Sequence, residues 1–233
     1  MSTNFQYQHA MDDDLLSSIA NRHCTRVFLK RPVSQETIQA VLSAAASAPS
    51  SQNNQPWQVT VLMGKSRDAL SARLCANFDQ GVAPTPDYLN RPIDMPGELQ
   101  QRVEDYGRSF LGFKGIARDD EVGRRNHRRD NFLFYGAPVE LIFHLPANAA
   151  PGTFLDLGFF MQNVILGFEA CGLASCPQYS VASYSDTVRD HLGFGRDRII
   201  ISGMAVGYPN KSARLNRFVP PRAPLDDYTQ WYV

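Results

Sequence analysis

The sequence lacks the patterns that mark most metal and dinucleotide proteins. Its 233 residues contain four cysteines and five histidines, with no C-x-x-C pair and no H-E-x-x-H or Cys/His ligand spacing, so no metal site is expected. Free thiols are the expected state of the cysteines. There is also no G-x-G-x-x-G run, which argues against a Rossmann-type nicotinamide site.

The sequence also lacks net charge and long apolar runs. Its 23 basic and 23 acidic residues balance, so it has no general attraction to nucleic acid or to an anionic membrane. The polar, acidic start MSTNFQYQHAMDDDLL is unlike a signal peptide. Polar residues such as Asp156 and Glu169 interrupt the apolar stretch Phe154–Leu173, which favours a buried helix over a membrane span. We expect a soluble cytoplasmic protein.

Composition and periodicity predict one α+β domain over residues 1–233. With 43% hydrophobic and 20% charged residues, the chain has the composition and size of a globular domain. β-Branched or apolar runs predict about four strands, and spacings of three and four apolar residues predict five or more helices around them. Strands are expected at 58–63, 139–145, 174–176 and 199–206, and helices at 12–21, 35–48, 66–76, 154–172 and 183–192.

The segment 79–131 differs from the rest of the chain. It contains four prolines (Pro84, Pro86, Pro92 and Pro96) and ends in the basic run Arg124–Arg129. So long an irregular stretch inside a compact domain predicts an excursion or lid over an active site. The basic run is either a solvated face or a contact for the extra phosphate of NADPH. The aromatic residues after it, Phe132, Phe134 and Tyr135, either line a substrate cavity or pack against the sheet.

Three polar segments carry the functional argument. The run Pro49-Ser50-Ser51-Gln52-Asn53-Asn54-Gln55-Pro56-Trp57 offers many uncharged donors and acceptors to a planar polar ligand, although it also suits an ordinary loop. The segment Arg22-His23-Cys24-Thr25-Arg26 follows a short helix pattern, and its two arginines would share a face if the helix continued. The third segment contains an isolated cation, Arg222, and the two prolines before it restrict the backbone there.

In this order, RHCTRVF, APSSQNNQPWQV, GLASCPQ, GYP and PPRAPL resemble the FMN-dependent nitroreductase family, and most of all its nitrobenzoate-reductase branch. The resemblance covers roughly Ile19 to Leu225 and is weaker over Asp79–Asn131. It implies a central mixed β-sheet with helices on both sides and an intertwined homodimer.

The resemblance also implies which residues bind FMN. Arg22 matches the phosphate-binding arginine at a helix end, and Arg26 matches the cation near N1 and O2 of the flavin. His23 and Cys24 match further flavin contacts, but Cys24 stands where the family often has serine, which puts a weak donor in place of a strong one. Arg222 matches the arginine that completes the phosphate site.

Two more segments follow from the resemblance. The first matches a segment that reaches the FMN held by the other subunit, which implies an active site at the dimer interface. The second matches the turn beside flavin N5. Their residues are Pro49, Ser50, Ser51, Asn53 and Gln55 in the first, and Pro177, Gln178, Tyr179 and Ser180 in the second.

The function that the resemblance implies is an FMN oxidoreductase. It takes hydride from NAD(P)H and reduces nitroaromatic compounds in two-electron steps by a ping-pong cycle, and no side chain acts as a nucleophile. Other flavin reactions on the same fold, such as quinone, flavin or enone reduction or dehalogenation, and a non-enzymatic flavin-binding redox sensor are the alternatives. The sequence does not choose between NADH and NADPH.

Overall fold

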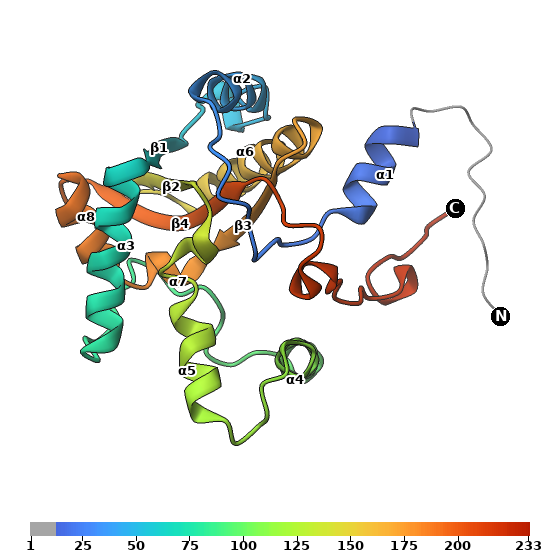
Figure 1. Cartoon of the computed structure of the whole chain (residues 1–233). Coiled ribbons are helices and arrows are strands. Elements are labelled where there is room, and N and C mark those ends of the chain that lie inside the picture. The colour runs from blue at the N-terminus through green and yellow to red at the C-terminus, as the bar shows by residue number, and fades with distance from the viewer. Residues whose placement is uncertain (1–12) are drawn as a thin grey trace.

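The computed structural model describes residues 13–233 and has an α+β fold (Figure 1). Its sheet has four strands in the order β1 (Gln58–Met63), β2 (Val139–Pro146), β4 (Arg198–Gly207) and β3 (Ala174–Gln178). The two middle strands are almost wholly buried, as a sheet covered on both faces requires. The predicted strands therefore form the centre of the domain.

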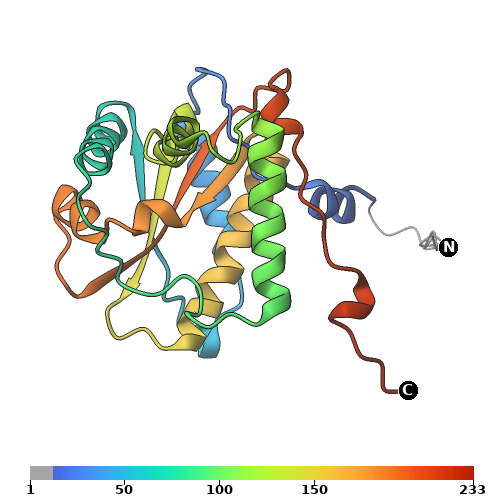
Figure 2. The same cartoon turned by 90° about the horizontal axis from the view of Figure 1, so that it is seen from below.

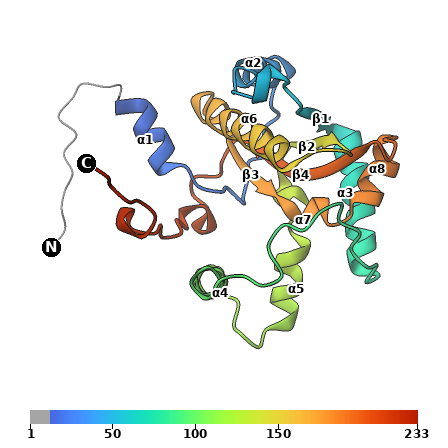
Figure 3. The ribbon, with the colours of Figure 1, turned by 180° about the vertical axis from the view of Figure 1, so that it is seen from behind.

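Helices cover both faces of the sheet (Figures 1 and 3). On one face α2 (Gln35–Ala45) and α6 (Pro151–Ala170) pack against the β2 side chains that point to that face, including Leu141 and Phe143. On the other face α3 (Gly64–Asp79), α7 (Tyr179–Ala182) and α8 (Ser185–Leu192) enclose Ile142 and Ala205. Because successive side chains of a strand point to opposite faces, one sheet supplies both hydrophobic cores.

Each pair of neighbouring strands runs antiparallel. The mixed sheet expected from the sequence is therefore not present within residues 13–233. The connection between β1 and β2 returns to the end of the sheet that it left, since Met63 is paired with Val139, as after a hairpin of unusual length. Helix α6 instead crosses from the end of β2, where Pro146 is paired with Arg198, to Ala174 at the other end of the sheet, so that β2 and β3 run in the same direction on either side of β4.

The connection between Met63 and Val139 contains the segment 79–131, which the sequence predicts to be an excursion or lid. After α3 it holds two further helices, α4 (Gly97–Lys114) and α5 (Glu121–Arg129). In Figure 2 α4 lies beside the body of the domain, apart from the sheet. Neither helix was among the predicted ranges. Helix α5 carries almost no apolar residues, whereas α4 repeats Leu99, Val103, Tyr106 and Phe110 at the spacing of three and four that marks a helix, a signal that the prediction overlooked.

The other helices and strands agree closely with the expected ranges. Ser34 caps α2, since its hydroxyl accepts a hydrogen bond from the backbone N–H of Thr37 at 3.2 Å. Gly172, just past the end of α6, has φ +70°, a conformation that favours glycine. The first helix, α1 (Asp13–Asn21), begins at the second residue of its expected range, and Asp12 lies outside the described residues.

Both ends of the described chain stand away from the domain body (Figures 1 and 2). Helix α1 exposes Leu15, Leu16 and Ile19, and the C-terminal segment exposes Trp231 and Tyr232. Large apolar side chains on two projecting segments are typical of an interaction surface. No helix within residues 13–233 is long and apolar enough to cross a membrane.

Candidate functional site

A cavity of about 560 Å³ brings together the two arginine segments predicted from the sequence. Its volume is in the range of cofactor and small-molecule sites, roughly 300–1,000 Å³. The walls come from the chain after α1, from α4 and from the C-terminal segment, and they include Arg22, His23, Cys24, Arg26, Arg102, Asp105, Tyr106, Ser109, Phe218, Pro220, Pro221, Arg222, Ala223, Pro224 and Asp227.

The segment after α1 is extended, and the helix ends at Asn21 as the sequence predicts. The backbone N–H of Thr25 donates to the carbonyl of Ser175 in β3 at 3.1 Å. In an extended chain residues i, i+2 and i+4 point to one side. Arg22 and Arg26 therefore still share a face, and Cys24 joins them there.

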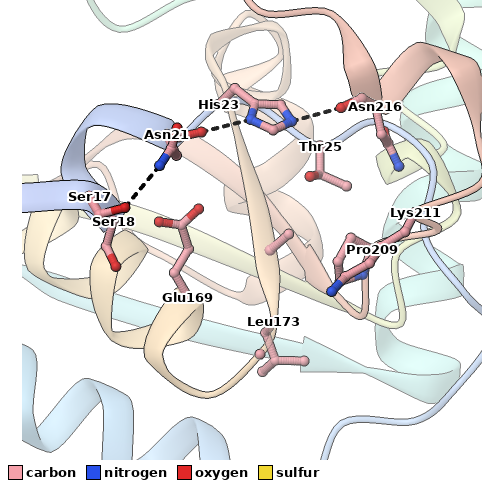
Figure 4. A pocket seen from close by; sticks show the side chains of 12 residues that line it. Ser17, Ser18, Asn21, His23, Thr25, Glu169, Leu173, Pro209, Lys211 and Asn216 are labelled. Atoms are coloured by element: carbon pink, nitrogen blue, oxygen red, sulfur yellow. Dashed lines mark hydrogen bonds between the residues drawn. The ribbon is translucent and has the colours of Figure 1, made fainter. Parts of the chain in front are cut away.

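The opposite side of this segment faces a second cavity, of about 480 Å³. Figure 4 shows His23 there between Asn21 and Asn216. The Nδ1 atom of His23 lies 2.9 Å from the Asn21 carbonyl, and Nε2 lies 2.7 Å from the Asn216 carbonyl. Carbonyl oxygens only accept, so the ring makes both hydrogen bonds when both nitrogens carry a proton.

Asn216 joins the two walls of the first cavity, and sequence reasoning missed it. Its Oδ1 accepts from the backbone N–H groups of Arg26 at 2.9 Å and Val27 at 3.1 Å. Its Nδ2 donates to the carbonyls of Val27 at 2.7 Å and Asn210 at 3.0 Å. A single amide thus fixes the arginine segment against the chain that leads to Arg222. No local sequence signal marks a residue whose partners are 189 and 190 positions away.

Helix α4 supplies an aromatic wall next to Arg26. The guanidinium donates to the hydroxyl of Tyr106 at 3.0 Å and lies over the ring of Phe110 at 4.6 Å from its centre. Phe110 and Tyr106 also contact Phe218 of the C-terminal segment. Cation–π contact and hydrogen bonding therefore hold the charge of Arg26 at the cavity.

The positive charge of the cavity is not neutralised by its acidic residues. Asp227 pairs with Arg102 at 3.2 Å, and Asp105 pairs with Arg108 at 3.2 Å. None of the ion pairs found among residues 13–233 involves Arg22, Arg26 or Arg222. Three guanidinium groups without carboxylate partners fit the phosphate of a monophosphate cofactor such as FMN.

The second predicted segment lies outside this cavity. Pro49, Ser51, Asn53 and Gln55 are exposed, and Ser50 is half-buried. Gln52, Asn53 and Gln55 all have φ between 45° and 58°, a left-handed conformation that costs non-glycine residues roughly 1–3 kcal/mol each. Strain of this kind in an exposed polar loop is more common at binding sites than in plain connections.

The third predicted segment is not a turn. Pro177 and Gln178 are the last residues of β3, and Tyr179 and Ser180 begin α7. Proline is tolerated there because β3 is an edge strand of the sheet. The side chain of Gln178 is buried and donates to the Asn131 carbonyl at 2.6 Å. None of these residues lines the arginine cavity.

Several open alternatives are decided by packing. Phe132 and Phe134 are buried in the core on the α3 side of the sheet, so both pack and do not line a cavity. Trp57 stacks on Phe160 with ring centres 4.8 Å apart, which makes it a core residue. In the basic run, Arg125 and Arg129 pair with Asp79 at 3.4 and 2.9 Å.

The structure is thus an α+β domain with a cationic cavity. The cavity lies between the segment that follows the first helix and the C-terminal segment. The sequence pattern of the nitroreductase family matches residues 19–208, and the chain belongs to that family. The family expectation from the sequence is thereby confirmed.

Particular relatives are similar over nearly the whole chain. The 4-nitrobenzoate reductase of Pseudomonas putida is 35% identical over 225 residues, covering 95% of this chain and 96% of that protein. Nitroreductase NfnB of Mycolicibacterium smegmatis is 36% identical over 214 residues, covering 91% and 90%.

Solved structures show the same architecture. The FMN and NADPH-dependent nitroreductase NfnB from a Sphigopyxis strain superposes with a TM-score of 0.91 at 35% identity and covers 94% of this chain and 98% of its own. The FMN-dependent NfnB of Mycobacterium smegmatis, solved in complex with NADPH, gives 0.89 at 34% identity, with 94% and 97% covered. The predicted nitroreductase fold is confirmed.

Proposed function

We propose that this protein is an FMN-dependent oxidoreductase that takes hydride from NAD(P)H and reduces nitroaromatic compounds. The observation that carries the proposal is the cavity on which Arg22, Arg26 and Arg222 converge without carboxylate partners. Family membership and the named activities of the relatives support the same reaction. When bound, FMN supplies the two-electron chemistry, and the protein supplies binding, orientation and electrostatics.

The residues of the cavity divide this work. Arg22 and Arg222 hold the phosphate, since guanidinium groups bind phosphate with paired donors. Arg26 faces the N1 and O2 side of the ring, where its charge favours the reduced form. His23 and Cys24 lie between them, and the wall from α4 limits access of water. Pro177, Gln178, Tyr179 and Ser180 remain the proposed neighbours of N5.

The proposed active site needs two subunits. None of the five residues Pro49, Ser50, Ser51, Asn53 and Gln55 lines the cavity, and four of them are exposed, so they serve the FMN of a second copy. The exposed apolar residues of α1 and of the C-terminal segment support a homodimer. Free thiols throughout the described chain support a cytoplasmic location.

The excursion 79–131 forms a cap on this site within a single domain. Four of its residues, Arg102, Asp105, Tyr106 and Ser109, line the cavity. The connection that contains the excursion leaves and re-enters the sheet at the paired residues Met63 and Val139. Its polar helices can therefore move without disturbing the strands. We place substrate access under this cap.

The experiment is a visible spectrum of the purified protein followed by steady-state oxidation of NADH and of NADPH, with and without 4-nitrobenzoate. We expect a yellow protein with about one FMN per chain and acceptor-dependent turnover. Bound flavin without acceptor-dependent turnover identifies a redox sensor instead. A protein with FAD, or with no flavin after heat release, contradicts the proposal.

A further inference from the structure

Cys24 and Cys176 form a pair of thiols at the floor of the arginine cavity. Cys24 lines the cavity, and Cys176 lies behind it in β3 with 1% of its surface exposed. The backbone hydrogen bond from Thr25 to Ser175, 3.1 Å long, holds the two segments side by side. Cys24 packs against the hydrophobic cluster to which Cys176 belongs. Two cysteines 152 positions apart in the sequence thus meet at one place.

The surroundings of Cys24 favour its thiolate. A hydrogen bond from the Cys176 thiol, followed by the charges of Arg26 and Arg22 acting against burial, lowers the pKa of Cys24 to about 5. The hydrogen bond to Cys24, together with burial, raises the pKa of Cys176 well above its usual range. One member of the pair is therefore ionised and the other keeps its proton.

Burial raises the pKa values of three neighbouring acids, Tyr106, Tyr135 and Glu140, which favours the uncharged form of each. Glu140 is on the Cys176 side, because both residues are paired with Ala205 across the sheet. The cations of the cavity remain the only full charges next to the Cys24 sulfur among the groups that set its pKa.

We propose that Cys24 and Cys176 are a redox-active pair that hydrogen peroxide converts into a disulfide within the cofactor cavity. Redox-sensitive cysteines are accessible thiolates in positive surroundings with a second thiol nearby. Cys24 is half-buried but lines an open cavity together with Arg22 and Arg26, and Cys176 lies on the neighbouring strand. The proposal rests on the two thiols and their cavity and goes beyond the nitroreductase activity.

The chemistry needs no group beyond the two cysteines and the peroxide. The Cys24 thiolate attacks one peroxide oxygen, the O–O bond breaks, and hydroxide leaves with the bonding electrons. The product is a sulfenic acid, so Cys24 no longer accepts the hydrogen bond that kept Cys176 protonated. Cys176 then attacks the Cys24 sulfur, the S–O bond breaks, and the departing hydroxide takes up the Cys176 proton. Two thiols lose two electrons and two protons, and one peroxide becomes two waters.

The other two cysteines are internal controls. Cys171 is exposed at the end of α6 and has no cation-lined cavity around it, and Cys75 is buried in α3, where burial raises its pKa. At pH 6 a thiol of pKa about 5 is roughly nine-tenths ionised, against about one part in a thousand for the ordinary value of 9.0. A thiolate of lower pKa is also less nucleophilic, which lowers its rate by about a hundredfold. The net alkylation rate of such a thiol is then about ten times that of an ordinary one.

The test uses the purified protein with its flavin and a second sample freed of FMN by dialysis. Each is treated with iodoacetamide at pH 6, or with hydrogen peroxide followed by alkylation, and then digested and weighed by mass spectrometry. We expect Cys24 to be alkylated about ten times faster than Cys171 in the FMN-free sample. Peroxide should produce a linked Cys24–Cys176 peptide that dithiothreitol separates.

Two variants separate the roles of the pair. In Cys176→Ser, peroxide should leave Cys24 as a sulfenic acid that dimedone traps, with no linked peptide. The matched variant Cys171→Ser should form the Cys24–Cys176 link at the parental rate. The proposal is wrong if neither sample yields the linked peptide while Cys171 is oxidised, or if Cys24 is alkylated no faster than Cys171 in the FMN-free sample. Either result is independent of whether the protein reduces nitroaromatic compounds.

Discussion

Arg222 shows how a single exposed side chain can serve a cofactor without serving the fold. It is exposed, stands between prolines and forms none of the ion pairs within residues 13–233. Arg222→Ala should therefore weaken FMN binding by about 1.5–3 kcal/mol, the scale of a charge-assisted hydrogen bond, with the melting temperature of the FMN-free protein unchanged. Arg217→Ala, on the same segment but outside the cavity wall, is the control. Equal FMN affinities in flavin titrations of both variants would remove Arg222 from the phosphate site.

Arg26 should act on the redox potential more than on cofactor retention. Arg26→Gln keeps hydrogen-bonding groups but removes the charge that favours the reduced state, so the flavin midpoint should fall. A loss of about 1.4 kcal/mol in differential binding corresponds to about 30 mV for a two-electron couple. Redox titrations at one pH and equal flavin content measure the shift.

Arg22→Gln is the matched control for that experiment. If Arg22 lies on the phosphate, its loss lowers FMN affinity and leaves the midpoint where it was. A midpoint that stays constant in Arg26→Gln as well would place Arg26 away from the ring.

At the scale of single residues, the arginines of the site could be predicted from the sequence, but the hydrogen bonds that position them could not. Arg22, Arg26 and Arg222 could be named because guanidinium groups near a polar segment suggest a phosphate. Arg22 and Arg26 share a face although the helix ends before them, because a spacing of four returns to the same side in an extended chain too. Asn216 could not be named, since its importance comes from hydrogen bonds to Arg26 and Val27.

Strand β2 holds a titratable group that links the stability of the fold to pH. His144 is 4% exposed, and burial, followed by the charge of Arg198, lowers its pKa to about 4. In the unfolded chain its pKa is about 6.5. As pH falls from 6.5 to 4, the unfolded chain takes up the proton first, so the free energy of unfolding should decrease over that window and level off below it.

His144→Leu should reduce this loss by about 1–3 kcal/mol between pH 6.5 and 4. Other titrating groups contribute to parent and variant alike and cancel in the difference. Urea unfolding at pH 4.5, 5.5 and 6.5 gives the comparison. Identical slopes in parent and variant would contradict the assignment.

At the scale of helices and strands, burial explains what could be predicted. The strands carry continuous apolar runs and were found almost to the residue. Helices α4 and α5 were missed because the four prolines and the basic run of 79–131 indicated an irregular segment, although α4 has apolar residues at helical spacing. In the structure α4 makes contacts such as Phe110 with Phe218, and α5 makes ion pairs such as Arg129 with Asp79. Strand β3 runs on through Pro177, which an edge strand accepts and a central strand does not.

The whole molecule raises the question of which chain completes which site. The resemblance placed five residues of the polar run on the flavin: Pro49, Ser50, Ser51, Asn53 and Gln55. None of them lines the arginine cavity of its own chain, and all but Ser50 are exposed. Contacts between subunits leave no periodic signal in a sequence. A direct experiment must therefore ask whether the two halves of a site belong to one chain or to two.

Mixed dimers give that answer. One chain carries Arg222→Ala, and the other carries Asn53→Ala with Gln55→Ala, under different affinity tags. If each FMN is held by Arg222 of one chain and Asn53 and Gln55 of the other, a mixed dimer has one site with all the lesions and one intact site. It should then bind one FMN with parental affinity and a second much more weakly, because each lost hydrogen bond costs about 1 kcal/mol and the lost charge more.

The alternative arrangement makes a different prediction with the same proteins. If both halves come from one chain, each site in the mixed dimer carries one kind of lesion and neither keeps parental affinity. Fluorescence titration of FMN into dimers purified on both tags distinguishes the two arrangements. Shared sites give one tightly bound FMN per dimer, and sites within one chain give two weakly bound FMN molecules. In the control dimer Ser47→Ala replaces the double variant, since Ser47 is exposed just before the polar segment. The second FMN should then bind with the affinity of the Arg222→Ala protein. A mixed dimer with no tight phase would assign the exposed segment to its own chain and end the case for a shared site.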